Sequence, residues 1–263
     1  MKSIFSLFIL DHAYQVVQPI VDAKTKEVHF FELLTRVVYN NQTYMPAEFI
    51  SDMSPHMKYS LAKKLFFTIA KLQKTYPTIS FSLNISSLEI EMGIESFIEE
   101  LMKDKKTAID PLRCIIEITE HSQLKSNKIF ESILSIKEKF GFRFALDDFG
   151  SEYATFKQLY KKGSGFDYVK IDGSMVKGID KDQNIQNSLR LIVDLIKLHG
   201  KKAIVEYVST EQEMNAVIET ANPDYLQGYY LGEPRPIETY IRPPNSLKNL
   251  LNKQDFHDEQ KLA

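Results

Sequence analysis

The sequence predicts an α/β fold, a TIM-like (β/α)8 barrel with an irregular, antiparallel first strand. Eight short strand-like runs alternate with helix-like runs over about 230 residues. The first two runs are joined only by D-A-K-T-K-E at residues 22–27, which suits a hairpin better than a crossover helix. From there the pattern is strand followed by helix, repeated, as in a barrel.

The strand-like runs are short and apolar, and several end at a polar residue or a turn. We expect strands at residues 14–21, 28–34, 79–84, 113–119, 142–147, 166–171, 202–206 and 225–227. Helical spacing of apolar residues fills most gaps between them. We expect helices at residues 58–75, 88–104, 127–140, 153–161, 184–199 and 211–220. An open doubly wound sheet is the alternative, but no glycine-rich fingerprint follows an early strand.

Length and composition are those of an ordinary globular chain. The 263 residues are 43% hydrophobic and 26% charged, enough for one large domain or two small ones. No linker, repeat or low-complexity tract divides the chain, so we expect one domain over residues 1–243 and a polar tail over 244–263. The net charge of −2 and the pI of about 6.3 give no basic surface for DNA.

The single cysteine, Cys114, lies in an apolar strand pattern and cannot form an internal disulfide. A reducing compartment, the cytoplasm, is therefore the expected location. The opening M-K-S-I-F-S-L-F-I-L has a short apolar run, is followed at once by Asp11, and has no cleavage site. We expect a packed N-terminal segment. No run approaches the roughly 20 apolar residues of a membrane span.

The segment F-R-F-A-L-D-D-F-G, residues 142–150, carries two adjacent carboxylates, Asp147 and Asp148, after an apolar strand. Neighbouring side chains on an ideal strand point to opposite faces, so both can reach one ion only where the chain leaves the sheet. An Asp at this place also commonly caps the next helix, but one Asp would suffice for that. The pair favours a metal site.

Polar residues stand at or near the end of almost every expected strand. In a barrel these ends form the active face. The residues are Glu32, Asn84, Glu117, Asp147, Asp148, Lys170, Glu206 and Gln227. Taken singly, Asn84 could cap the next helix and Glu32 could pair with Arg36. Together, carboxylates converging on one mouth would repel each other without cations.

Hard oxygen ligands without a His or Cys cluster indicate Mg²⁺ or Mn²⁺. Two such ions bridged by one Asp are the usual arrangement for splitting a phosphodiester. Lys170 closes the run F-D-Y-V-K at the same rim. It could hold a nucleophilic water or a phosphate oxygen, and a salt-bridged rim lysine is an equally good interpretation of its spacing.

The chain resembles the EAL-domain family of bacterial cyclic di-GMP phosphodiesterases from about residue 14 to residue 236. The matching pieces occur in the same order and spacing, which makes the resemblance specific. They are Q-P-I-V-D (18–22), F-E-L-L-T-R (31–36), S-L-N-I-S (82–86), I-E-I-T-E (116–120), A-L-D-D-F-G (145–150), V-K-I-D (169–172), V-E-Y-V-S-T (205–210) and Y-L-Q-G-Y (225–229).

The resemblance implies roles for individual residues and supports the barrel with an irregular first strand. It implies metal ligands at Glu32, Asn84, Glu117, Asp147, Asp148 and Glu206. It implies that Lys170 acts on the attacking water, with Glu32 and Glu206 also catalytic. Gln18, Arg36 and Gln227 match substrate-contacting positions, and Glu120 matches a glutamate that steadies the loop after Asp148. A homodimer through residues 148–160 is also expected.

The sequence departs from the family pattern at a few positions. Leu33 replaces the signature alanine, and Glu152 replaces a usual glycine in the loop after the Asp pair. Tyr207 and Ser209 replace a glycine and a second glutamate after Glu206. Gly173 replaces a usual arginine after V-K-I-D. The carboxylate missing at Ser209 is expected to loosen the second metal.

We expect a two-metal phosphodiesterase specific for cyclic di-GMP, with linear pGpG as its product. The alternative is a catalytically weak or inactive EAL-like module that binds cyclic di-GMP or a protein partner, an interpretation motivated by Glu152, Tyr207 and Ser209. An unrelated barrel metalloenzyme would explain the carboxylates but not the order of the motifs.

Overall fold

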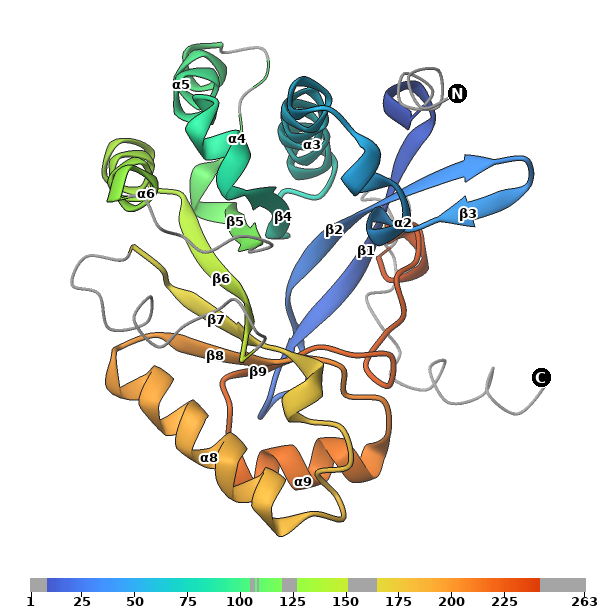
Figure 1. Cartoon of the computed structure of the whole chain (residues 1–263), viewed down its shortest axis with the longest axis vertical. Coiled ribbons are helices and arrows are strands. Elements are labelled where there is room, and N and C mark those ends of the chain that lie inside the picture. The colour runs from blue at the N-terminus through green and yellow to red at the C-terminus, as the bar shows by residue number, and fades with distance from the viewer. Residues whose placement is uncertain (1–8, 105–106, 108, 120–126, 151–164, 242–263) are drawn as a thin grey trace.

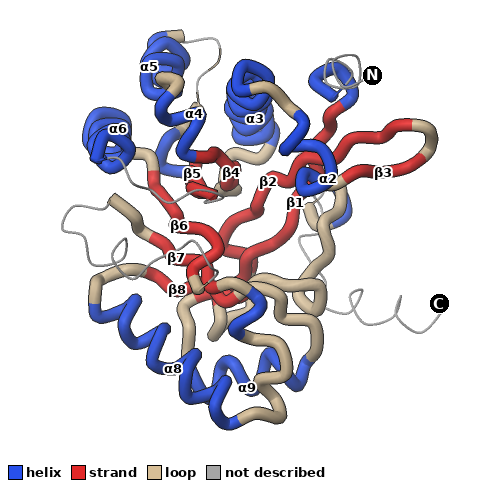
Figure 2. The backbone as a smooth tube through the Cα atoms, in the orientation of Figure 1, coloured by secondary structure: helices blue, strands red, loops and turns tan. Residues whose placement is uncertain are grey.

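The structure, a computed structural model, describes residues 9–104, 107, 109–119, 127–150 and 165–241 of the 263-residue chain. Its centre is a closed barrel of eight strands surrounded by helices (Figures 1 and 2). Around the barrel the strands follow the order β1-β9-β8-β7-β6-β5-β4-β2, and β2 pairs back to β1. The predicted barrel is therefore confirmed.

The strands are β1 Ala13–Asp22, β2 Val28–Tyr39, β3 Gln42–Tyr44, β4 Phe81–Ser86, β5 Cys114–Thr119, β6 Arg143–Phe149, β7 Tyr168–Ile171, β8 Lys202–Val205 and β9 Tyr225–Leu226. The α-helices are α2 Pro46–Phe49, α3 Pro55–Thr75, α4 Ser87–Glu91, α5 Ile94–Lys103, α6 Asn127–Phe140, α8 Gln183–Leu198 and α9 Glu211–Ala221. Short 3-10 turns occupy Ile50–Asp52, Pro111–Arg113, Gly173–Met175 and Ile237–Thr239.

The first strand runs against its two neighbours, as predicted. β1 pairs antiparallel with β2, where Gln18 lies opposite Glu32, and antiparallel with β9. The other neighbours around the barrel, from β2 through β4 to β9, pair in parallel. The connection between β1 and β2, residues 23–27, forces the reversal, because it is too short to carry the chain back across the barrel.

Strand β2 continues past the barrel and pairs with β3, an edge strand that the sequence pattern did not reveal. The two-residue turn between them is Asn40-Asn41, and both residues have positive φ, at 50° and 59°. Asn tolerates this conformation, which matches the twist of a tight hairpin. Figure 1 shows the β2–β3 hairpin projecting away from the barrel.

The prediction of a single helix at residues 88–104 is wrong. The chain forms two helices, α4 and α5, separated at Met92 and Gly93. Gly93 has a φ of 89°, a left-handed value that a continuous helix cannot accommodate and that favours glycine. The expected helix at 153–161 and the polar tail at 244–263 lie outside the described residues, as do residues 242–243 of the expected domain.

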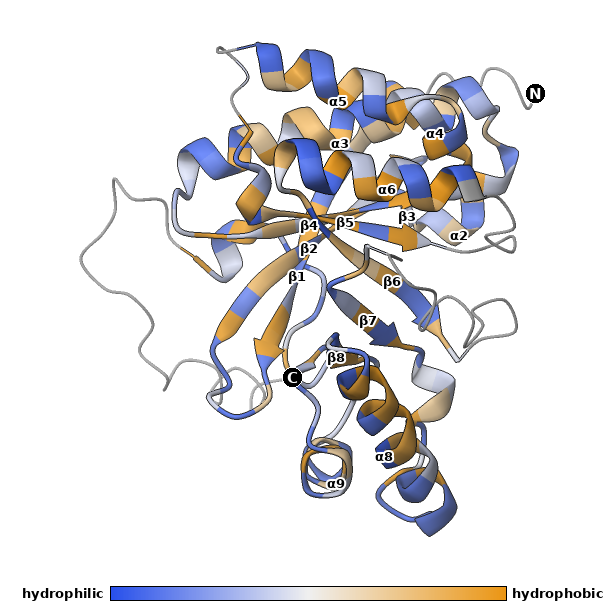
Figure 3. Cartoon of the chain, turned by 90° about the vertical axis from the view of Figure 1, so that its left-hand side faces the viewer, coloured by the Kyte–Doolittle hydropathy of each residue, from blue (hydrophilic) through white to orange (hydrophobic). Residues whose placement is uncertain are grey.

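Caps and apolar faces explain the other long helices. Ser54, Asp182 and Thr210 accept backbone N–H groups at the starts of α3, α8 and α9. Each helix buries an apolar stripe against the barrel and leaves a polar face outward (Figure 3). Among the described residues no helix combines the length and apolar character needed to cross a lipid bilayer.

Apolar side chains fill the barrel interior toward the N-terminal ends of the parallel strands. Ile20, Phe30, Ile115, Ala145, Tyr168 and Ile204 form one buried cluster. On five strands the residue two positions later is Glu32, Glu117, Asp147, Lys170 or Glu206. Because strand side chains alternate with a period of two, these polar residues also point inward, one layer higher. The apolar layer is therefore the floor of the polar site.

Candidate active site

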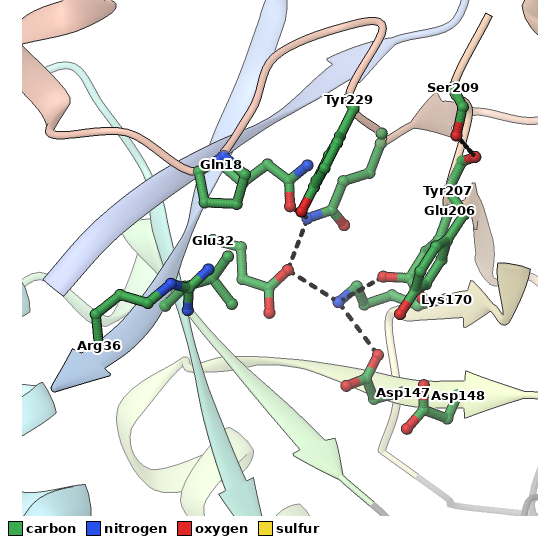
Figure 4. A pocket seen from close by; sticks show the side chains of 14 residues that line it. Gln18, Glu32, Arg36, Asp147, Asp148, Lys170, Glu206, Tyr207, Ser209 and Tyr229 are labelled. Carbon is green, nitrogen blue, oxygen red and sulfur yellow. Dashed lines mark hydrogen bonds and ion pairs between the residues drawn. The ribbon is translucent and has the colours of Figure 1, made fainter. Parts of the chain in front are cut away.

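A pocket of about 430 Å³ opens above this floor. It is lined by Gln18, Glu32, Leu34, Arg36, Asp147, Asp148, Lys170, Glu206, Tyr207, Ser209, Gln227, Gly228, Tyr229 and Pro234 (Figure 4). Its volume is in the range of sites that hold small molecules. Most of the residues expected at the strand ends therefore meet in one place.

Lys170 is the centre of the site. Its side chain is 2% exposed, and its Nζ lies 2.7 Å from Glu117, 2.9 Å from Glu206, and 3.1 Å from both Glu32 and Asp147. These carboxylates come from β2, β5, β6 and the end of β8. The sequence also allowed a lysine that forms a salt bridge at the rim of the barrel. Lys170 does form ion pairs, but it forms them inside the barrel.

One ammonium cannot neutralise four carboxylates, and the pKa values reflect this. Burial alone would lower the pKa of Lys170, but the surrounding carboxylates raise it well above its ordinary value. Burial and the charge of Glu32 raise the pKa of Glu117 to about 8. Burial also raises the pKa of Asp147 and of Glu206 above the ordinary values. Additional positive charge would stabilise the ionised form of these acids.

Glu32 is held by three donors. Asn84 Nδ2 donates to Oε1 at 2.7 Å, Gln227 Nε2 donates to Oε2 at 2.7 Å, and Lys170 Nζ donates to Oε2 at 3.1 Å. Burial would raise the pKa of Glu32, but Lys170 and these amides outweigh it and lower the pKa. The suggested pairing with Arg36 does not occur, since Arg36 donates to the Thr35 carbonyl at 2.8 Å.

Asn84 faces the site and does not cap a helix. The N-cap of α4 is Ser86, which exchanges contacts with Glu89 in a capping box. Asn84 donates through its amide nitrogen to Glu32 Oε1 at 2.7 Å, so its side chain contacts the site. That oxygen, Oδ1, and Glu117 Oε1 are buried and have no hydrogen-bond partner among the described residues.

The two aspartates reach the site from adjacent positions because β6 is irregular there. The strand does not end at residue 147 as expected but runs to Phe149. Its register against β7 shifts between Leu146 and Phe149, and Asp148 has a φ of 52°. Such a bulge re-aims a side chain. Asp147, Asp148 and Glu206 offer oxygens that all lie within 4.8 Å of one another.

These donors fit divalent cations. The set consists of carboxylate and amide oxygens, and Glu117 Oε1 and Asn84 Oδ1 are buried acceptors that a hard cation would satisfy. Asp147 belongs both to the group around Lys170 and to the cluster with Asp148 and Glu206. Asp147 is therefore the acid that the two groups share.

The remaining substrate-contacting candidates lie on the opposite wall. Gln18 on β1 donates to the Gly232 carbonyl and accepts from Gln227 at 3.3 Å. Every second residue of β2 faces the same side, so the pocket is lined by Glu32, Leu34 and Arg36.

Leu33 points the other way, is 1% exposed and packs in the core beneath the helices. The change from alanine at this position therefore does not touch the site.

The segment after Glu206 closes one edge of the pocket. Ser209 donates through Oγ to the Tyr207 carbonyl at 2.9 Å, and its N–H donates to Glu213 at 2.9 Å. A Cβ on Gly228 would lie 2.1 Å from the Val208 carbonyl oxygen, so only glycine permits this close approach beside Gln227.

Several lining residues were not anticipated. Leu34, Gly228, Tyr229 and Pro234 line the pocket, and only the period-two spacing from Glu32 could have indicated Leu34. Tyr229 closes the Y-L-Q-G-Y motif but was given no role. Glu120 and Glu152 lie outside the described residues, as does most of the expected dimer segment at 148–160.

Comparison with known proteins gives a consistent picture. The profile of the EAL domain matches residues 7–234 of the chain. The cyclic di-GMP phosphodiesterase PdeB of Shewanella oneidensis is 29% identical over 201 residues, 74% of this chain and 23% of PdeB. The probable cyclic di-GMP phosphodiesterase PdeA of Escherichia coli is 31% identical over 216 residues, 78% of this chain and 28% of PdeA. The chain thus spans about a quarter of the length of these curated relatives.

A solved structure has the same architecture. The EAL domain protein from Listeria monocytogenes superposes with a TM-score of 0.74 at 26% identity, covering 90% of this chain and 94% of that one. The residues matched by the family profile, 7–234, include every strand of the barrel.

Proposed function

This chain belongs to the EAL domain family, and we propose that it is a metal-dependent phosphodiesterase that hydrolyses cyclic di-GMP to linear pGpG. The observation that carries the proposal is the cluster of four carboxylates around the buried Lys170, extended by Asp148 and Asn84. The names of PdeB and PdeA support the substrate. We propose that this activity serves bacterial signalling.

Two Mg²⁺ or Mn²⁺ ions would be held by Glu32, Asn84, Glu117, Asp147, Asp148 and Glu206. When bound, these cations supply charge stabilisation to the phosphoryl oxygens and lower the pKa of water. The chain's own groups then orient the substrate. Arg36 offers donors for a phosphate, and Gln18 and Gln227 lie beside Glu32 on the same wall.

Lys170 has two tasks in this proposal. Its ammonium keeps the four carboxylates together in one buried layer, and we propose that it also donates a hydrogen bond to the attacking water. In the reaction the oxygen of a water bonds to phosphorus, and the bond between phosphorus and the 3′ oxygen breaks. One proton of the water passes to the leaving 3′ oxygen. The product is the linear dinucleotide with a 5′-terminal phosphate.

The test separates an enzyme from a binding module. Purified protein is mixed with cyclic di-GMP in Mg²⁺, in Mn²⁺ or in excess chelator, and the nucleotides are separated by chromatography. We expect pGpG with either metal and intact cyclic di-GMP with chelator. Tight binding by calorimetry without pGpG in millimolar Mn²⁺ would instead support the receptor alternative.

We also propose that the protein forms a homodimer. Light scattering across micromolar concentrations tests this proposal.

Ser209 provides a prediction about metal affinity. Its hydroxyl binds the Tyr207 carbonyl and supplies no carboxylate to the pocket. We expect Ser209→Glu to lower the Mn²⁺ concentration for half-maximal rate by roughly 10–100-fold, since outer carboxylates tune metal affinity by that factor. Ser209→Gln, similar in size but uncharged, is the matched control. An equal effect of both variants, or no effect of Ser209→Glu, contradicts the prediction.

A further inference from the structure

Tyr207 has an unusual backbone for a large aromatic residue. Its φ is 60°, in the left-handed region that non-glycine residues rarely adopt. The residue is also 67% exposed, although it lines the pocket next to Glu206. A conformation that costs free energy at the edge of a site is an observation that calls for a functional explanation.

Gly173 makes room for this ring. A Cβ built on Gly173 would lie 2.3 Å from Tyr207 Cγ and 2.4 Å from Cδ2, far too close for any real contact. Gly173 itself is buried and does not have a positive φ, so its backbone does not require glycine. The ring therefore rests against the Gly173 backbone. The two residues form one feature, which we call the Tyr207–Gly173 pair.

The pair places a flat aromatic surface beside the acid cluster. Figure 4 shows the Tyr207 side chain alongside Glu206, with Asp147 and Asp148 nearby and Tyr229 at another edge of the same pocket. The part of the Tyr207 ring at Cγ and Cδ2 lies against Gly173, and most of the residue remains open to solvent. An exposed ring beside a phosphate-type site suits the base that a nucleotide carries next to its phosphate.

We propose that Tyr207 is a substrate-positioning residue, whose ring stacks on a purine base of the cyclic dinucleotide while the phosphodiester lies on the carboxylate cluster. This inference rests on the proposed function. Gly173 supports this role, because the absence of a side chain there lets the ring occupy the stacking position. The Tyr207 hydroxyl is not required.

The test measures binding, with a slowly hydrolysed phosphorothioate analogue of cyclic di-GMP as the probe. Tyr207→Gly should weaken binding by about 5- to 140-fold, the factor that corresponds to loss of one stacked base. It should not lower the melting temperature, because glycine adopts this φ freely. Tyr207→Phe should bind like the parent.

A double-mutant cycle tests the role of Gly173. Gly173→Ala should weaken binding in the parent, where the new Cβ displaces the ring, but should have no effect in the Tyr207→Gly background. A second readout uses the lack of tryptophan in the chain. In the Tyr207→Trp variant the fluorescence should be quenched by the analogue, whereas Leu191→Trp, on the exposed face of α8, should not respond.

The outcomes distinguish the two proposals. Binding by Tyr207→Gly that equals or exceeds parent binding would overturn the stacking role and leave the phosphodiesterase proposal standing. A loss in Tyr207→Phe as large as in Tyr207→Gly would overturn it too, because the hydroxyl would then be the active group. A parent protein that neither binds the analogue nor cleaves cyclic di-GMP would overturn both.

Discussion

Lys170→Met is expected to lower both the stability of the fold and the turnover. The variant removes the ammonium that lies within 3.1 Å of four carboxylates and leaves those acids facing one another. Breaking a buried ion pair in this way costs about 3–5 kcal/mol. Turnover should fall by roughly 10²–10³-fold, as when a positioned donor is lost. Thermal unfolding and the rate of pGpG formation measure the two effects.

Lys137→Met is the matched control, because Lys137 pairs with the single carboxylate of Asp167 and is 33% exposed. We expect it to change the melting temperature little and the turnover not at all. Added Mn²⁺ should raise the melting temperature of Lys170→Met, since a cation can take over part of the neutralisation. Parent-like turnover in Lys170→Met would remove Lys170 from the mechanism.

Glu32→Gln is expected to abolish measurable turnover while the fold survives. The amide keeps the size of the side chain but lacks the charge that a cation needs. Its NH2 group also donates where one Glu32 oxygen accepts a hydrogen bond. Glu32→Ala should behave alike. Equilibrium Mn²⁺ binding, measured by calorimetry, should weaken in both variants, and circular dichroism should show intact secondary structure.

Glu89→Gln serves as its control. Glu89 is as buried as Glu32, at 5% exposure, but it caps α4 and does not line the pocket. We expect Glu89→Gln to reduce the melting temperature and to leave Mn²⁺ affinity and turnover per folded molecule unchanged. Full activity of Glu32→Gln, or of the parent in excess chelator, would contradict the two-cation mechanism.

The sequence predicted the barrel and the convergence of polar residues because both follow from local periodicity. Strands of period two place Glu117, Asp147, Lys170 and Glu206 on one inner layer, and parallel strands bring their ends together. The bulge at Asp148 was not predictable in detail, since it depends on the register between β6 and β7. Its consequence, two adjacent aspartates in one site, was expected.

Contacts between distant strands could not be predicted from spacing. The sequence left Lys170 equally suited to a rim salt bridge or a catalytic role, and only closure of the barrel shows it buried among four acids. The bond from Gln227 to Glu32 likewise joins residues 195 positions apart. Tyr207 and Gly173 were two unrelated departures in the sequence, and their contact shows them to be one feature.

Local signals were also missed. Gly93 interrupts the expected helix at 88–104, and its position between two apolar helical patterns was a readable signal for a break. The Asn40-Asn41 turn likewise fits a tight hairpin, although too short a run follows it to be recognised as a strand.

Metal-dependent hydrolysis of cyclic di-GMP at the carboxylate cluster around Lys170 is the proposal on which the other predictions depend. It is tested most directly by running the reaction with Mn²⁺ in ¹⁸O-labelled water and analysing the nucleotides by mass spectrometry. The account predicts linear pGpG with one ¹⁸O atom in its 5′-terminal phosphate, and no product when Mn²⁺ is chelated. Intact, unlabelled cyclic di-GMP after prolonged incubation in millimolar Mn²⁺ would contradict it.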